Sequence, residues 1–225
     1  MKTSLCFCVL LSLVVIAHPS RTAEEDFRAD LTGFVPLFDG KTLNGWSRLS
    51  EGGDWKVVDG TIVGGQLPGG RGGLLVTEKK YSDYELYAEV LATYPLDTGL
   101  FLRILSNRNH YQVTIDYRPT GEIGAIYGPQ PNGRGDYFKH CHEGFSHWNP
   151  NRYNPVRVRI EGQPPRIQVW IRDSQIMDFQ DTAVDGKPRF ERSGAVGIQV
   201  HGGESWGEGS RVTFRNLMIK ELDSK

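Results

Sequence analysis

Apolar and polar side chains alternate along five stretches of the chain, and this alternation predicts β-strands. A strand places successive side chains on opposite faces of its sheet, so every second residue points to the same side. No window of helical length carries apolar residues at the spacing of an amphipathic helix. The alternating stretches are residues 86–90, 111–115, 156–160, 167–171 and 196–200.

Turn-forming residues separate the alternating stretches. Asp-Gly and Asn-Gly pairs at 39–40, 59–60, 132–133 and 185–186 supply the positive backbone angles that hairpins prefer. Many short strands with turns between them are typical of an antiparallel two-sheet sandwich or barrel. We expect the interior of this fold to include Val113, Val158, Val169, Ile198 and Phe214.

The last predicted strand changes phase along its length. Val212 and Phe214 are two residues apart, but Leu217 and Ile219 fall on the opposite parity. One extra residue near Asn216 would return all four apolar side chains to one face. The sequence therefore predicts a β-bulge near Asn216.

The N-terminus has the pattern of a signal peptide. Lys2 is followed by an apolar run over residues 5–17, which is too short to span a bilayer comfortably. We therefore interpret residues 1–23 as a signal peptide, cleaved after Ala17 or Ala23, and expect a secreted or periplasmic protein. An N-terminal membrane anchor and a buried helix are the alternatives.

The rest of the chain suits a single domain, which we expect over residues 34–222. No later segment is apolar enough to cross a membrane. Residues 24–225 carry 24 basic and 27 acidic side chains, and this near-neutral balance gives no electrostatic footprint for nucleic acid. Only Cys141 is left once the signal peptide is removed, so we expect no intrachain disulfide.

Several separate motifs, in the right order along the chain, resemble those of the 3-keto-disaccharide hydrolase family. Three of them read FVPLFDGKTLNGW (34–46), TGLFLR (98–103) and GIQVHG (197–202). The others lie at residues 55–60, 75–78, 84–86, 124–128 and 214–216. The resemblance covers about residues 34–222, which is nearly the whole mature chain.

The resemblance implies an all-β fold, a jelly roll of the concanavalin-like lectin and glucanase type with two antiparallel sheets. It also implies cleavage of glycosides already oxidised at C3. The carbonyl acidifies the C2 proton, so a base can remove it, the C1 substituent is expelled and water adds afterwards. This route needs a base that titrates near neutral pH and a cation or donor beside the enolate oxygen.

His201 is the leading candidate for the base. It lies on the polar parity of a strand whose other face is apolar, and imidazole titrates nearest to neutral pH. Glu204 and Asp116 are the other candidate carboxylates, while a purely structural histidine is the alternative reading. The resemblance also places Arg103 in the cleft as the cation partner, although an arginine between large apolar neighbours can also snorkel at a sheet edge.

The candidate sugar-binding residues are amides and aromatics on the polar parity or outside the apolar periods: Gln112, Gln199, Trp46, Tyr127 and Trp206. Solvated outer faces and core aromatics produce the same pattern, so the interpretation rests on the family resemblance. Relatives often carry a glutamate two residues before a glutamine in the strand where this chain has Gln112 and Thr114. If that glutamate has a role in relatives, another residue of this chain must take it, or the role is lost.

The longest segment without alternation, residues 128–154, is predicted to be an irregular loop. It contains His140, Cys141, His142 and His147, but their spacing matches no established zinc pattern. We expect no cofactor, with a divalent metal as an open alternative.

Two other functions stay open at this stage. The same fold hosts non-catalytic carbohydrate-binding modules, and an extracellular structural or adhesion domain is a third reading. Ionisable groups that converge on one cavity would favour an enzyme. A flat aromatic platform without such groups would favour a binding module.

Overall fold

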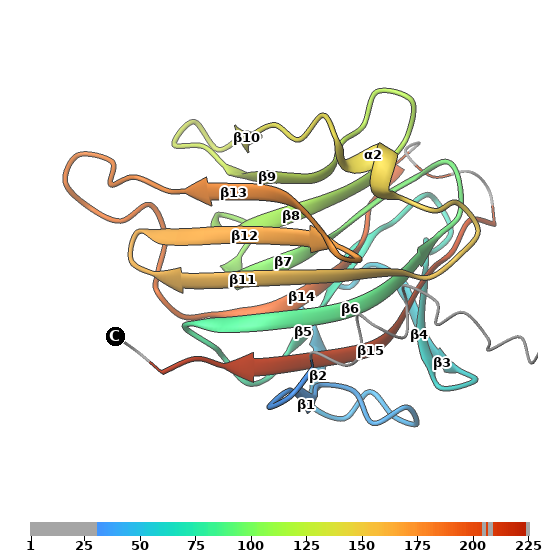
Figure 1. The fold of residues 1–225 in the computed structure, drawn as a ribbon. Helices are drawn as coiled ribbons and strands as arrows, with labels where there is room; N and C mark the ends of the chain where they lie inside the picture. The colour runs from blue at the N-terminus through green and yellow to red at the C-terminus, as the bar shows by residue number, and fades with distance from the viewer. Residues whose placement is uncertain (1–30, 204–205, 207–208, 224–225) are drawn as a thin grey trace, which may run out of the picture.

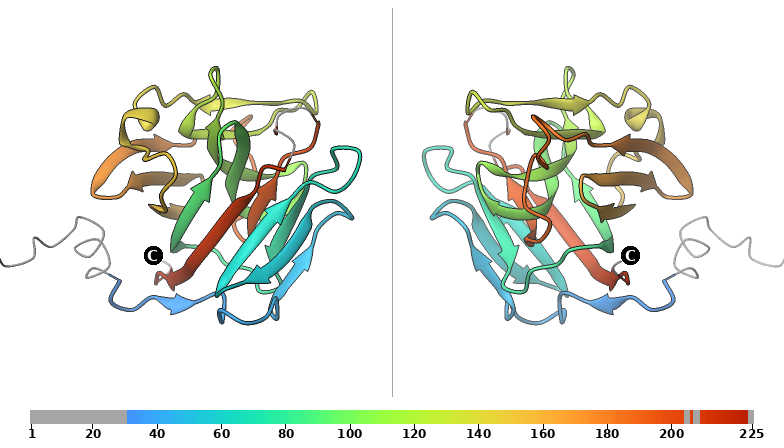
Figure 2. Two further views of the ribbon diagram at one scale, coloured as in Figure 1. Left: turned by 90° about the vertical axis from the view of Figure 1, so that its right-hand side faces the viewer. Right: turned by 90° about the vertical axis from the view of Figure 1, so that its left-hand side faces the viewer.

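The computed structural model describes residues 31–203, 206 and 209–223, so the predicted signal peptide lies outside the described residues. Two antiparallel sheets pack face to face (Figure 1). The strands of the first sheet, in spatial order, are β13 (Ser174–Gln180), β12 (Pro165–Ile171), β11 (Asn154–Gly162), β6 (Tyr84–Ala92), β15 (Val212–Glu221), β4 (Thr61–Gly65) and β3 (Asp54–Val58). The short β1 (Val35–Pro36) pairs with β15, and Figure 2 shows it (blue) along the lower side of the molecule.

The second sheet forms the other layer of the sandwich. Its strands, in spatial order, are β10 (Gly135–Lys139), β9 (Ile123–Pro129), β8 (Asn109–Tyr117), β7 (Leu96–Ser106), β14 (Ala195–Val200), β5 (Gly73–Thr77) and β2 (Trp46–Arg48). The predicted two-sheet antiparallel sandwich is therefore confirmed.

The core lies between the sheets, where the predicted alternation put it. Val113, Val158, Val169, Ile198 and Phe214 are each at most 1% exposed. They come from both sheets, so their side chains interdigitate across the interface between the layers. All five interior residues that the pattern predicted are confirmed.

The predicted bulge is present in β15. The register of β15 against β6 shifts between Arg215 and Met218, and Asn216 has a φ of 49°, which is left-handed backbone. The bulge turns the Asn216 side chain to donate from Nδ2 to Oε1 of the buried Glu89, over 2.7 Å. The phase change in the sequence was therefore the signature of a local insertion.

The segment 128–154 is more ordered than the sequence predicted. It contains β10, which pairs with β9 as the edge strand of its sheet, and the four-residue helix α2 (Gly144–His147). The prediction of an irregular loop was wrong there, because β10 pairs along only one side and carries little apolar periodicity. Among the described residues no helix is long and apolar enough to cross a membrane.

Candidate functional site

A cavity of about 270 Å³ opens on the face of the second sheet that points away from the core. The strands β7, β8 and β14 form its floor, since their polar side chains alternate with core residues. Gln112 and Thr114 flank the core residue Val113, and Gln199 flanks Ile198. The residues lining the cavity are Asp97, Gln112, Thr114, Asp116, Arg118, Tyr127, Tyr137, Gln199 and His201.

A glycine in the floor gives the amide side chains room to meet. The register between β7 and β8 pairs Asp97 with Asp116 and Gly99 with Thr114. A Cβ atom on Gly99 would lie 2.4 Å from Nε2 of Gln112, so a larger residue would displace that amide. Gln112 instead donates from Nε2 to Oε1 of Gln199 over 3.2 Å. This bond leaves one acceptor oxygen on Gln112 and one donor nitrogen on Gln199 outside it.

Arg118 is the cation of the cavity. Its Nε lies 2.6 Å from Oδ1 of Asp116 and its Nη2 lies 2.5 Å from Oδ2, which is a bidentate pair. The same Nη2 lies 3.0 Å from Oδ2 of Asp97. Hydrogen bonding to Asp116 is the main reason that the pKa of Arg118 is raised above its ordinary value. The guanidinium is therefore fixed and permanently charged, with a side chain that is 34% exposed.

His201 lies beside Asp97 at the rim of the cavity. Its Nδ1 is 2.7 Å from the carbonyl oxygen of Gly202, which can only accept, so Nδ1 carries the proton of the neutral ring. The other ring nitrogen, Nε2, lies 3.7 Å from Oδ2 of Asp97. The main chain of His201 is anchored by Gln66, whose Nε2 donates to its carbonyl oxygen over 2.8 Å.

Asp97 is an unusual carboxyl group. Its burial raises the pKa to about 6; the nearby His201 and Arg118 act in the opposite direction, and Asp116 adds to the rise. Its pKa consequently lies well above that of an ordinary aspartate and close to that of an ordinary imidazole. A carboxyl with such a pKa beside an imidazole is typical of a site that moves protons.

Two tyrosines form the wall of the cavity on the side of β9 and β10. The Tyr127 and Tyr137 rings meet edge to face, with centroids 5.3 Å apart. Burial, followed by nearby carboxylates, raises the pKa of Tyr137 to about 12. Its hydroxyl group therefore stays protonated at neutral pH and can donate a hydrogen bond.

Arg103 does not line this cavity, contrary to our expectation. It has a φ of 49° at a register shift of β7, and its side chain is 0% exposed. The guanidinium donates to the carbonyl oxygens of Ser82 (2.7 Å) and Gly162 (3.0 Å) and to Oδ1 of Asp83 (2.8 Å). The family resemblance had implied a place in the cleft, but the irregular backbone turns the side chain in a direction that regular alternation would not give.

The two candidate tryptophans do not line the cavity either. Trp46 and Trp206 are each 6% exposed and belong to the main core. Trp46 donates from Nε1 to the carbonyl oxygen of Leu37 over 2.7 Å. Trp206 donates from Nε1 to the main-chain oxygen of Asp97 over 2.7 Å, so it holds the main chain of this cavity residue in place. Glu204 lies outside the described residues.

The sequence reasoning brought Gln112, Asp116, Tyr127, Gln199 and His201 to one place, and the cavity contains all five.

Four further lining residues were missed. Thr114 lies between Gln112 and Asp116 on the same polar parity, but it was not named as a site residue. Arg118 continues the polar parity of Gln112 and Asp116, so the sequence pattern could have identified it as a site residue. Asp97 lies two residues before Gly99, and only strand pairing brings it opposite Asp116. Tyr137 lies in the segment that was interpreted as a loop.

The histidines of segment 128–154 do not form a metal centre. Nδ1 of His140 lies 2.6 Å from Oε1 of Glu122, and the His140 ring stacks on His142 at 5.7 Å. Across residues 31–203, 206 and 209–223, no three His, Cys, Asp or Glu side chains gather closely enough to hold a metal ion. Cys141 is buried and free.

Comparison with known proteins identifies relatives over most of the chain. The family model of the 3-keto-alpha-glucoside-1,2-lyase-like domain matches residues 33–220. A protein from Bacteroides thetaiotaomicron named 3-keto-disaccharide hydrolase is 23% identical over 239 residues, which cover 86% of this chain and 80% of the relative.

Solved structures share the fold at low identity. A provisionally named glycosyl hydrolase from Parabacteroides distasonis has a TM-score of 0.63 at 19% identity, covering 84% of this chain and 99% of its own. The carbohydrate-binding module CBM66 from Bacillus subtilis has a TM-score of 0.59 at 15% identity, covering 79% and 96%. A β-1,3-1,4-glucanase from a mouse hindgut metagenome has a TM-score of 0.51 at 9% identity, covering 78% and 92%. The concanavalin-like jelly roll is therefore confirmed as the fold.

Proposed function

The chain belongs to the family of 3-keto-alpha-glucoside-1,2-lyase-like domains, and from this premise we propose that it cleaves glycosides that carry a carbonyl at C3. Its mature form acts outside the cytoplasm, after removal of residues 1–23. The substrate binds in the cavity on the second sheet, and the reaction begins with removal of the C2 proton.

One observation carries this proposal: a proton acceptor and a fixed cation share one small cavity. Nε2 of His201 and Oδ2 of Asp97 lie 3.7 Å apart, and Nη2 of Arg118 lies 3.0 Å from the same oxygen. An enolate-forming reaction needs a base on one side of the reacting carbon and a positive charge near the oxygen that becomes negative. At about 270 Å³, the cavity suits a sugar ring rather than the larger ligands of typical drug-sized pockets.

His201 is the base in this proposal. Its Nε2 takes the C2 proton, and the electron pair of the C–H bond moves onto the C3 oxygen as an enolate. Asp97 stabilises the imidazolium that forms, as carboxylates do beside catalytic histidines. Arg118 takes the role that the family resemblance implied for Arg103, because its guanidinium lies in the cavity while that of Arg103 is buried elsewhere.

Expulsion of the C1 substituent completes the cleavage. The enolate electron pair returns to form a C1–C2 double bond, the C1–O bond breaks, and the leaving oxygen takes a proton from the imidazolium or from the protonated hydroxyl of Tyr137. Water can then add across the new double bond, so that the net reaction is hydrolysis. Gln112, Gln199 and Tyr127 bind the remaining hydroxyl groups of the sugar.

The carboxylates support elimination over the ordinary glycosidase route. That route uses two carboxyl groups on opposite sides of the scissile bond, one as acid and one as base or nucleophile. Here both oxygens of Asp116 are bound by Arg118, at 2.6 and 2.5 Å. Asp116 is therefore a positioning group for the cation rather than a nucleophile.

Isotope exchange tests the proposal directly. We expect the protein to release the aglycone from 3-keto-glucosides, and in heavy water the C2 position of the product should take up deuterium. Mass and proton resonance read C2, after correction for spontaneous exchange of the keto sugar. Complete retention of the C2 hydrogen would exclude elimination. Binding of sugars without turnover of any 3-keto-glycoside would instead identify a carbohydrate-binding module, the function named for CBM66.

A further inference from the structure

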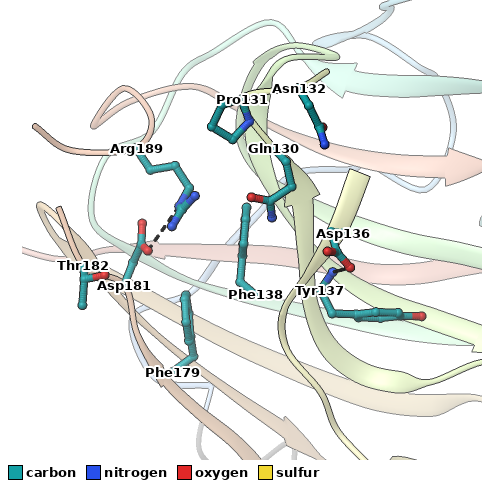
Figure 3. A pocket seen from close by; sticks show the side chains of 10 residues that line it. All are labelled: Gln130, Pro131, Asn132, Asp136, Tyr137, Phe138, Phe179, Asp181, Thr182 and Arg189. Atoms are coloured by element: carbon teal, nitrogen blue, oxygen red, sulfur yellow. Dashed lines mark hydrogen bonds and ion pairs between the residues drawn. The ribbon is translucent and has the colours of Figure 1, made fainter. Parts of the chain in front are cut away.

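A second hollow, of about 670 Å³, lies where the two sheets end side by side. The edge strand β10 of the second sheet and the edge strand β13 of the first form its walls (Figure 3). We call it the edge groove. The residues that line it include Gln130, Phe138, Phe179, Asp181 and Arg189. It is distinct from the cavity described above, although Tyr137 on β10 lines both hollows.

Two phenylalanines form an apolar floor in the edge groove. The rings of Phe138 and Phe179 are nearly parallel, with an interplanar angle of 12° and centroids 6.4 Å apart. Cζ of Arg189 lies 4.5 Å from the centroid of the Phe138 ring. Figure 3 shows Phe138 below Gln130, with Arg189 to one side. Both rings are only half-buried, so a ligand can reach them.

Polar groups surround this floor. Asp181 is 3% exposed; its Oδ2 accepts the hydroxyl of Tyr111 at 2.6 Å and its Oδ1 lies 3.4 Å from Nε of Arg189. Between the residues that the structure describes, no hydrogen bond uses Nη1 or Nη2 of Arg189 or the side-chain amide of Gln130. These donors and acceptors remain available to a ligand.

The charge of the groove favours a neutral ligand. Its lining includes one cation, Arg189, and two carboxylates, Asp136 and Asp181. Asp181 is already the partner of that cation, so no net positive charge is left to attract an anion. Aromatic faces beside amide and guanidinium donors suit a sugar ring, which has apolar C–H faces and a rim of hydroxyl groups.

We propose that the edge groove is a second saccharide subsite, which binds a neutral sugar unit of a glycan whose reacting end occupies the cavity. Tyr137 lines both hollows, so the cavity and the edge groove adjoin at this side chain. A third hollow of about 230 Å³ shares Gln130, Pro131 and Arg189 with the groove and continues it. The link to the reacting end rests on the proposed function, whereas sugar binding in the groove does not.

Binding of unoxidised oligosaccharides tests the subsite without catalysis. The probes are α-1,4- and β-1,4-linked glucotetraoses, which lack the C3 carbonyl. Added to the ¹⁵N-labelled full chain, at least one probe should shift the backbone amide resonances of Gln130, Asn132 and Thr182. Phe179→Ala should weaken this binding about tenfold, as truncation of an aromatic anchor does.

Two further variants distinguish a loss of sugar binding in the groove from a general effect of substitution or misfolding. Phe145→Ala removes an exposed aromatic side chain that lines none of the three hollows, so it should leave the affinity unchanged. Gln130→Ala should weaken binding, and it preserves the fold because its only described hydrogen bonds are made by the main chain. If neither probe moves these amides, or if Phe179→Ala binds as tightly as the parent chain, the groove is not a saccharide subsite. Shifts caused only by an added extended peptide would make β10 a strand-pairing edge instead.

Chain-length dependence then tests the link to the cavity. A 3-keto-tetrasaccharide should have a KM about tenfold lower than a 3-keto-disaccharide, and Phe179→Ala should remove this advantage while kcat on the disaccharide stays unchanged. An equal KM for both lengths would overturn the link. No turnover of either substrate, with intact binding in the groove, would refute the proposed function and leave the subsite standing.

Discussion

Arg103 on β7 and Arg118, which directly follows β8, come from neighbouring strands of one sheet and are each paired with aspartate, but their surroundings differ in almost every respect. The Arg103 side chain is 0% exposed and its donors reach Ser82, Asp83 and Gly162, which belong to segments of the opposite sheet. The Arg118 side chain is 34% exposed, and its partners lie around a cavity.

The two arginines show how one residue type serves stability in one place and chemistry in another. Burial lowers the pKa of Arg103, and the cost of that burial is offset by carbonyl oxygens and a carboxylate that tie the two sheets together. Hydrogen bonding to Asp116 raises the pKa of Arg118, which therefore stays charged beside open space. A ligand can reach only the second guanidinium.

The largest effect is expected in the cavity, from loss of the base. His201→Gln should lower kcat by about 10²–10⁴-fold, the usual contribution of a general base, while the melting temperature stays close to that of the parent. Steady-state kinetics on a 3-keto-glucoside and a thermal melt measure both. His142→Gln, an exposed histidine outside the cavity, is the matched control. Normal turnover by His201→Gln would move the base to Asp97.

The next largest effect is expected in the buried cluster. Arg103→Met should lower the free energy of unfolding by about 3–5 kcal/mol, because it leaves the Asp83 carboxylate without its buried partner. Chemical denaturation measures the loss. Arg192→Met removes the other arginine bound to Asp83, whose side chain is 42% exposed, and should cost under about 1 kcal/mol. Equal losses for the two variants would show that burial does not distinguish these pairs.

Arg118→Met should have the opposite profile to Arg103→Met: a large loss of activity with little loss of stability. We expect kcat to fall by about 10²–10³-fold, as for removal of a group that stabilises an oxyanion, with little change in stability. The comparison fails if Arg118→Met unfolds the protein or keeps full activity. Arg134→Met, at an exposed arginine outside the cavity, is the control for a simple change of net charge.

The smallest effect concerns the pH dependence set by Asp97. Its folded pKa of about 6 lies above the ordinary 3.8, so the folded state binds this proton more tightly than the unfolded chain does. The stability it contributes is fully present below pH 3.8 and is lost as pH rises through about 6. Asp97→Asn should therefore stabilise the protein by about 3 kcal/mol at pH 8, with a gain that develops as pH rises from about 4 to 6.

Activity should show the opposite trend. In the parent chain, kcat/KM should fall as pH drops below about 6, because the Asp97 carboxylate that supports the imidazolium becomes protonated. Asp97→Asn should be slower at every pH and should lose this acid limb. Melting curves and pH–rate profiles of both proteins provide the test. An unchanged acid limb would assign it to another group.

Regular strands made most of the fold predictable. The interior positions Val113, Val158 and Ile198 followed from alternation alone, since the two faces of a strand are distinguished by every second residue. The bulge at Asn216 was also predictable, because an inserted residue must shift the apolar parity. The edge strand β10 was missed, since it carries no such alternation.

The candidate site was predictable only where its residues follow the alternation of side chains along a regular strand. Gln112, Asp116, Gln199 and His201 were found from their polar parity. The expectation for Arg103, which came from the family resemblance, failed because a left-handed residue at a register shift directs its side chain into the protein.

The sequence by itself determined the family, the two-sheet architecture, the core and the polar stripes, because each follows from local order along the chain. Only the tertiary structure decided which charges meet. Asp97 and Asp116 are brought together by strand register, and Tyr137 reaches both the cavity and the edge groove only because β10 pairs with β9. Burial of Asp97, the main cause of its raised pKa, likewise depends on residues distant in sequence, so no local pattern could reveal it.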